Sequence, residues 1–512
     1  MSQGHKTPPE PTLFFCGADL YRHIPKSHFY ERLGRLLDLS FVYELTRPLY
    51  APKLGRPSLD PVVFFKCMLI GFFENIVYDT ELEFRLADSL VLRRFLGYAL
   101  DERTPDESTL RKTRQSLPEE VFRQVFERVL DQCQAAGLLK GRVLGTDSTV
   151  VDANASMDSL RHKSLGCTYE EYMVALKRQD QPSATKEEAR AADRKRGYGK
   201  ASNEVWESAT DPEARVMQHA DGHTHLSYRI DATVDLETGV IVATGAEYGH
   251  VSDQADFLLR VDEATVALAE RDLGVPVFVA DKGHHSGENL AGLEARQVVG
   301  LISSPRTERG HPGFRRSDFR YDAEHDLFRC PAGKTLARRS GAEDAARQYQ
   351  ARGSVCRACP HFGTCTQSKT GRSLSVPAHE DLIQANRERV RELEWRPLMQ
   401  IRRQRGEGPF GYYKQFGGLR RVAGRGLDCA QKKTLVAGVG WNLLCLLRHA
   451  RGFLALARRR KGWFRALCRA LRAPLASETR VGPFRRWRQR PADVASLWSG
   501  LLIRNPHLSG GC

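Results

Sequence analysis

The stretch GRVLGTDSTVVDANAS, residues Gly141–Ser156, places two carboxylates inside a run of apolar and β-branched residues. Residues 142–152 predict a β-strand, because Val and Thr pack well on a pleated sheet surface. Side chains alternate along a strand, so Asp147 and Asp152 point to opposite faces. A buried carboxylate is costly unless a partner compensates it. We interpret Asp152 as a strand-end or turn residue, so the two acids do not form a pair.

The segments after this strand alternate in a way that is typical of an α/β fold. Their predicted strands are 225–235, 239–249, 275–281 and 298–304, and their predicted helices are 252–272 and 286–297. The order β-β-β-α-β-α-β predicts a mixed sheet flanked by helices. Asp281 ends one strand, at the carboxyl end where open α/β sheets gather ligands. Asp147 and Asp281 meet if their strands are neighbours. His284 and His285 are predicted to have capping or surface roles.

Changes in composition divide the chain into five predicted regions. They are a helical N-terminal domain over 1–140, a first part of the core over 141–305 with an exposed insertion at about 155–215, an Arg- and Cys-rich insertion over 306–380, a helical part of the core over 381–450 and a basic tail over 451–512. The N-terminal helices fit either a DNA-binding module or a packing and dimerisation domain. The tail fits either phosphate binding with aromatic stacking or a disordered end.

The charge of the chain favours a polyanionic partner. Its 78 Lys and Arg residues against 62 Asp and Glu residues give a formal net charge of +16. Nucleic acid is the partner that this balance favours, and a generally basic surface is the alternative. We expect no membrane span, because the longest apolar run, Thr434–Leu447, has 14 residues. Without a signal sequence, we expect a cytoplasmic, nucleoid-associated protein whose twelve cysteines are reduced or bind metal.

Four of these cysteines lie in the 306–380 insertion. They are Cys330, Cys356, Cys359 and Cys365. The Cys-x₂-Cys pair is a sound half-site for zinc, whereas the spacing of the other two thiols is less regular than in a zinc ribbon. We predict a structural Cys₄ zinc site, with reduced cysteines in a small loop-rich subdomain as the alternative.

A third acid follows in IRRQRGEGPFGYYKQFGGLRR, residues Ile401–Arg421. Helical spacing puts Arg403 one turn before Glu407 and Lys414 two turns after it, on roughly one face. A carboxylate beside basic groups suits a metal together with a phosphate. The alternative is an ordinary salt bridge worth a few tenths of a kcal/mol.

Taken together and in this order, the motifs resemble those of bacterial insertion-sequence transposases of the DDE superfamily, in the branch with an InsH-type N-terminal domain. The resemblance covers about residues 20 to 450. Its N-terminal motifs are LDLSFVYEL, GRPSLDPVVFFKCMLIGFF and TPDESTLRKTR, and its later motifs are GTDSTVVDANAS, VFVADKGHHSGENL and RRQRGEGPFGYYKQFGGLRRVAGRG.

The resemblance implies an RNase H-like core in which Asp147, Asp281 and Glu407 bind Mg²⁺ or Mn²⁺. It matches the family's basic residues to Arg403 and Lys414. We predict further DNA contacts at the basic residues that follow, Arg420, Arg421 and Arg425. The chain departs from the family at two positions. Gln400 stands where some members have Tyr, and Gly406 stands where an apolar residue is expected.

The implied activity is Mg²⁺-dependent nicking of double-stranded DNA at transposon ends, followed by attack of the freed 3′-hydroxyl on target DNA. The implied assembly is a homodimer on DNA. Two other hypotheses remain at this stage. One is a catalytically decayed or domesticated DNA-binding protein, and the other is an RNase H-like nuclease unrelated to transposition.

Overall fold

The computed structural model describes residues 3–4, 6, 20–51, 57–195, 202–219, 222–304, 313–322, 324–340 and 346–450, and the backbone of 451–472. The chain forms two compact units, Met1–Ala450 and Arg451–Cys512. The predicted basic tail thus lies outside the residues whose side chains are described. Among the described residues, no helix has the length and apolar character that crossing a membrane requires.

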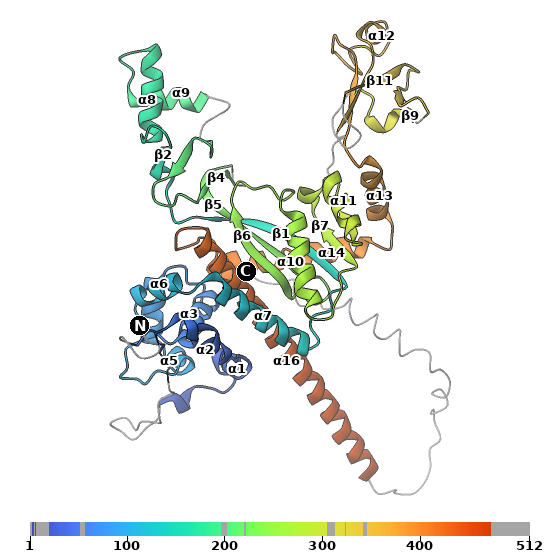
Figure 1. Cartoon of the computed structure of the whole chain (residues 1–512). Coiled ribbons are helices and arrows are strands. Elements are labelled where there is room, and N and C mark those ends of the chain that lie inside the picture. Colours follow the sequence, from blue (N-terminus) through green and yellow to red (C-terminus); the bar gives the residue numbers. More distant parts are fainter. Residues whose placement is uncertain are drawn as a thin grey trace, which may run out of the picture. The chain divides into compact units, whose positions relative to one another are not determined.

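A six-stranded mixed sheet forms the centre of the first unit (Figure 1). Its strands are β1 (Val143–Asp152), β4 (Arg215–Gln218), β5 (Thr224–Asp235), β6 (Ile241–Tyr248), β7 (Val277–Ala280) and β8 (Val299–Ile302). β5 pairs antiparallel with β1 and β6, whereas β7 pairs parallel with β1 and β8. The order β6-β5-β1-β7-β8 is that of an RNase H-like sheet, so the predicted fold class is confirmed.

The register of β1 and β7 brings two predicted site residues to one place. Gly145 pairs with Val279, and the part of β1 that pairs with β7 ends at this residue. Continued by two residues, the same parallel register places Asp147 beside Asp281. Asp281 directly follows the last residue of β7. Parallel neighbours thus carry both carboxylates to the same edge of the sheet.

Helices and short 3-10 turns cover the sheet. They are α10 (Phe257–Ala269), η4 (Lys282–His284), α11 (Gly287–Ala295), α13 (Glu380–Arg391), α14 (Arg396–Arg405), α15 (Gly408–Phe416) and α16 (Leu427–Arg472). α10 packs on β6, α13 on β8 and α14 on β7. The buried Asn442 of α16 donates to the carbonyl of Ile241 and accepts from its amide, both at 2.8 Å. These hydrogen bonds join α16 to β6, an edge strand that pairs with a strand, β5, on one side only.

The N-terminal region is helical, as predicted. Its elements are η1 (Leu20–His23), α1 (Phe29–Leu36), α2 (Phe41–Thr46), η2 (Arg47–Leu49), α3 (Pro61–Phe73), α4 (Asp79–Asp88), α5 (Leu90–Leu96), α6 (Glu107–Ser116) and α7 (Glu119–Ala135). α3 begins where the Asp60 carboxylate accepts from the amides of Val62 and Val63, and most of its residues are buried. Its buried Phe72 lies against Gly440 of α16, so the N-terminal helices and the core share one hydrophobic cluster.

Two insertions interrupt the sheet elements. The first holds η3 (Met157–Ser159), β2 (Leu160–His162), α8 (Tyr169–Asp180), α9 (Lys186–Lys195) and β3 (Trp206–Ser208). The second holds η5 (Arg316–Asp318), β9 (Arg320–Asp322), β10 (Leu327–Arg329), β11 (Thr335–Ser340), β12 (Arg347–Gln350), α12 (Gly353–Arg357) and β13 (Ser373–Val376). Instead of a loop-rich subdomain, the second insertion is a five-stranded antiparallel sheet. It has its own core around Leu336 and Tyr349.

Candidate functional site

Asp147 is a largely buried carboxylate on β1. Its side chain is 18% exposed, and its oxygens accept from the Ser148 amide at 2.9 Å and from Arg402 Nη1 at 3.1 Å. Burial raises the pKa of Asp147, while the Arg402 charge and the Ser148 amide oppose that rise. The nearby charge of Asp281 raises the pKa further. A neighbouring cation would therefore lower the cost of keeping this carboxylate ionised.

Asp281 has a different environment at the end of β7. Its Oδ1 accepts from the Gly283 amide at 2.8 Å and lies 2.8 Å from Nδ1 of His284. Burial raises the pKa of Asp281, but the hydrogen bond and charge of His284 and the Gly283 amide outweigh it and lower the pKa. His284 is buried, so the surface role predicted for it is wrong. His285 is half-buried, and its Nε2 lies 3.2 Å from Ser304 Oγ.

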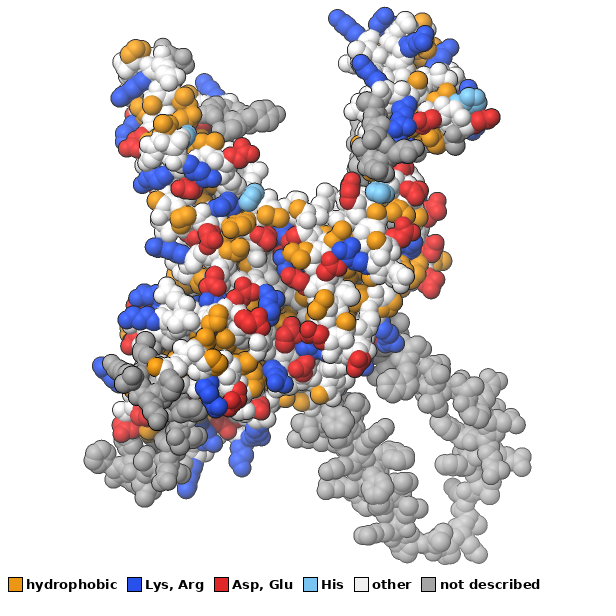
Figure 2. Space-filling view, in the orientation of Figure 1, with side chains coloured by type: hydrophobic (Ala, Val, Ile, Leu, Met, Phe, Trp, Pro, Cys, Tyr) orange, Lys and Arg blue, Asp and Glu red, His pale blue; other side chains and the backbone are white. Residues whose placement is uncertain are grey.

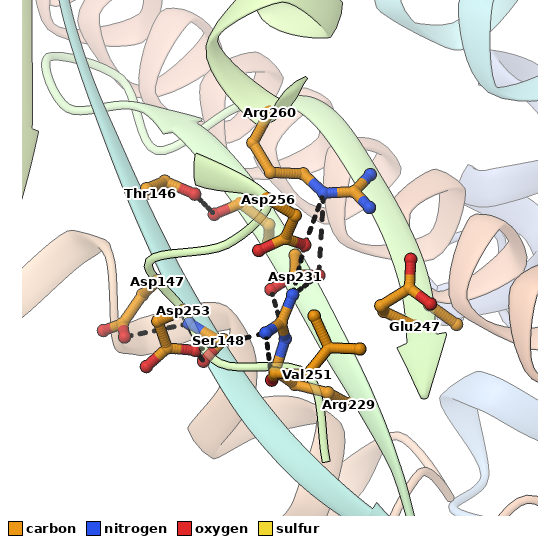
Figure 3. A network of polar contacts seen from close by, with 12 residues as sticks. Thr146, Asp147, Ser148, Arg229, Asp231, Glu247, Val251, Asp253, Asp256 and Arg260 are labelled. Atoms are coloured by element: carbon orange, nitrogen blue, oxygen red, sulfur yellow. Dashed lines mark hydrogen bonds and ion pairs between the residues drawn. The ribbon is translucent and has the colours of Figure 1, made fainter. Parts of the chain in front are cut away.

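A further acid, Asp253, joins this edge of the sheet from the loop after β6. Asp253, Asp281 and His284 each offer a ligand atom, and the three atoms lie within 4.8 Å of one another. Ser148 donates to Asp253 at 2.6 Å from its hydroxyl, next to Asp147 (Figure 3). Sequence analysis missed Asp253, because the helix predicted over 252–272 placed it in a first helical turn; α10 begins only at Phe257, which leaves Asp253 in the preceding loop. Its only signal is its place after the strand hairpin.

Glu407 lies at a break between two helices, so the prediction of one continuous helical face is wrong. α14 ends at Arg405, and Glu407 is the N-cap residue of α15, which has Pro409 in its first turn. Proline lacks an amide hydrogen and favours a helix start over a helix interior. The Glu407 side chain is 59% exposed.

Arg402, rather than the predicted Arg403, contacts the acids. Its Nη2 lies 3.6 Å from Glu407 Oε1, while its Nη1 bonds Asp147. The buried Arg402 therefore links the first and third acids of the predicted set. Arg403 is exposed.

The other predicted DNA-binding residues lie around Asp152. Arg421 Nη2 is 3.7 Å from Asp152 Oδ2, and Arg420 donates to the carbonyl of Lys414 at 2.8 Å. Burial lowers the pKa of Lys414, and the Asp152 charge raises it in part. Arg425 is exposed on the segment between α15 and α16. Asp152 is the last residue of β1, in agreement with its interpretation as a strand-end residue.

The four cysteines of the second insertion line one small cavity, together with His361. They are not disulfide-bonded. Within the described part of the chain, no three of their sulfur atoms lie within 4.8 Å of one another, as the ligand atoms of Asp253, Asp281 and His284 do. The structure therefore lends no support to the predicted zinc site.

The donor set at the sheet edge fits a hard divalent cation. Asp281 and Asp253 offer carboxylate oxygens, which Mg²⁺ and Mn²⁺ prefer as ligands, while the carboxylate of Asp147 lies outside the group of ligand atoms within 4.8 Å of one another.

Two regions of the chain match known protein families. Residues 18–116 match the family described as Transposase domain (DUF772). Residues 329–447 match the family described as Transposase DDE domain, and this region includes Glu407. None of the curated proteins matches the chain.

Three solved structures are similar to parts of the chain. "Mos1 transposase paired-end complex with left transposon end" is 12% identical, with a TM-score of 0.17, over 50% of this chain and 63% of that chain. "Crystal structure of a pre-cleavage Mos1 transpososome" is 10% identical, with a TM-score of 0.16, over the same shares of 50% and 63%. "Crystal structure of the Mos1 mariner paired end complex with Mn" is 10% identical, with a TM-score of 0.16, over 53% and 67%. The match spans less than two thirds of the first two chains.

Proposed function

Because residues 18–116 and 329–447 match transposase families, we propose that the chain is a DDE transposase, which nicks DNA at the ends of a mobile element and joins the freed 3′-hydroxyl to target DNA. Asp147, Asp281 and Glu407 are the proposed catalytic acids. The observation that carries this assignment is the parallel register of β1 and β7, which brings Asp147 beside Asp281.

The proposed acids would hold Mg²⁺ or Mn²⁺, which stabilises charge on the attacking and leaving oxygens of a phosphodiester when it is bound. The protein's own groups prepare the site for this. His284 and the Gly283 amide hold the Asp281 carboxylate in one orientation. Arg402 offsets the charges of Asp147 and Glu407 before a cation arrives.

Double-stranded DNA is the proposed partner, as both transposon end and target. Its phosphates would be neutralised by exposed or half-buried basic residues of α14, α15 and the segment that follows α15. The residues that we propose for this role are Arg403, Lys414, Arg420, Arg421 and Arg425. A homodimer on DNA is the proposed assembly, because two element ends must be processed together.

The test is a nicking and strand-transfer assay with Mg²⁺, using candidate terminal inverted repeats from the DNA on either side of the gene. Asp147→Asn, Asp281→Asn and Glu407→Gln should each lower nicking about 100-fold or more, while DNA binding persists. Asp262→Asn is the control, because Asp262 is a half-exposed acid whose ion pair, with Arg296, involves none of the proposed site residues. Nicking that survives Asp147→Asn would refute the assignment.

A second candidate function is DNA binding by a catalytically decayed copy. It is favoured by the helix break at Gly406 and the 59% exposure of the Glu407 side chain, which leave the third acid loosely held. Sequence-specific binding of the terminal repeats with no nicking in either Mg²⁺ or Mn²⁺ would identify this case. Nicking without strand transfer would instead indicate a nuclease.

A further inference from the structure

A large groove runs from Asp281 along the second insertion. It has a volume of about 1820 Å³ and is lined by η4, α13, α14 and the sheet β9–β13. Small-molecule sites measure about 300–1,000 Å³. The groove is therefore of a size for a segment of a polymer, and it opens at a proposed catalytic acid.

The lining of the groove is strongly basic. Eight Lys and Arg residues line it, against three acids. One of these acids, Glu380, forms an ion pair at 3.0 Å with Arg316, which ties α13 to the insertion. Arg387 and Arg391, four residues apart on α13, face the groove, and neither forms a salt bridge among the described residues. On the face shown in Figure 2, Lys and Arg side chains also stand out along the insertion.

One wall of the groove carries an aromatic ring. Tyr321 on β9 is 47% exposed, and its ring packs 5.0 Å from that of the buried Phe328. Its hydroxyl donates to Asp326 at 2.9 Å, which fixes the orientation of the ring. A held, half-exposed ring that lines the same groove as guanidinium groups without a salt bridge among the described residues is a combination by which proteins bind single nucleic-acid strands.

We propose that this groove holds one unpaired DNA strand that continues from the scissile phosphate at Asp281. Arg387 and Arg391 contact its phosphates, and a base stacks on Tyr321. The inference rests on the proposed function, which supplies the DNA and the reacting phosphate. It adds the part of the substrate beyond the cut and assigns a role to the second insertion.

The test measures binding of a fluorescein-labelled dT20 strand by fluorescence anisotropy in EDTA. Arg387→Gln with Arg391→Gln should weaken binding about ten-fold or more and lower the salt slope by about 1.4, since each lost single-strand phosphate contact removes about 0.7. Tyr321→Ala, in another element, should weaken binding about five-fold or more with the slope unchanged. Circular dichroism and gel filtration confirm that each variant is folded.

Arg320→Gln is the matched control. Arg320 precedes Tyr321 on β9, so its side chain points to the opposite face and does not line the groove. Its loss should change dT20 affinity less than two-fold. Unchanged binding in the Arg387 and Arg391 double variant would overturn the proposal. So would equal losses for dT20 and for a blunt duplex.

This assay is independent of the proposed chemistry, because dT20 contains no terminal repeat and EDTA prevents cleavage. If the protein nicks its terminal repeats but binds dT20 equally well without the two arginines, only the groove proposal is refuted. If the protein binds dT20 through the groove but nicks no DNA, only the proposed catalytic function is refuted.

Discussion

A buried network of charges behind the candidate site makes stability depend on pH in a defined way. Arg229, 2% exposed, lies between Asp231 and Asp256 and donates to the carbonyl of Val251 at 2.5 Å (Figure 3). Arg260 approaches Asp231 at 3.6 Å. Burial raises the pKa of Asp231 to about 6, although both arginines oppose the rise.

The sign of the effect follows from linkage. Between the ordinary pKa of 3.8 and the folded value of about 6, the folded chain binds the Asp231 proton more tightly than the unfolded chain does. Stability from this group is thus full at low pH and is lost as pH rises through about 6. From pH 4.5 to 7, the wild type should lose about 2 kcal/mol through Asp231. Asp231→Asn removes this pH-dependent part of the stability.

The predicted quantity is the change in unfolding free energy between the two pH values, compared between the variant and the wild type. This comparison cancels the pH-independent cost of removing the carboxylate beside two arginines. Urea unfolding followed by tryptophan fluorescence gives the unfolding free energy of both proteins at pH 4.5 and pH 7. The variant should gain about 2 kcal/mol on the wild type over that interval. Asp101→Asn, at an exposed acid, should show no such gain. A gain near zero, or one of opposite sign, would refute the reasoning.

Three further predictions concern the site and its support. His284→Ala should raise the pKa of Asp281, since His284 holds this pKa low. The acidic limb of the nicking pH profile should therefore move to higher pH. His285→Ala is the control and should leave the limb in place. Arg402→Gln should shift the same limb upward through Asp147, whereas Arg403→Gln should only weaken salt-dependent DNA binding. Gly440→Ala should cost about 1–3 kcal/mol in urea unfolding, because its Cβ would lie 2.3 Å from the Phe72 ring; Gly411→Ala, with open space around it, is the control.

The sheet and two of the acids could be predicted because they depend on local patterns. Alternating Val and Thr residues marked β1, and the buried run before Asp281 marked β7. Strand alternation then placed Asp147 and Asp152 on opposite faces. The sequence predicted that Asp147 and Asp281 meet only if their strands are neighbours. The parallel register of β1 and β7 confirms that they are.

The surroundings of those acids could not be predicted in the same way, because they depend on long-range contacts. Asp253 reaches the site from a loop, through Ser148 and the Arg229 network. His284 becomes buried only once α10 packs its Phe257 ring 5.2 Å away. Neither contact leaves a periodic trace in the sequence.

The choice between Arg402 and Arg403 shows how a break in a helix changes a site. A continuous helix through Glu407 would place Arg403, four residues earlier, beside it. Gly406, Glu407 and Pro409 end one helix and start another, which turns the neighbouring Arg402 toward the acids instead. Arg402 therefore lies between the Asp147 and Glu407 carboxylates, whereas Arg403 is exposed. The helix break at Gly406 thus accounts for the contact of Glu407 with Arg402 in place of the predicted neighbour, Arg403.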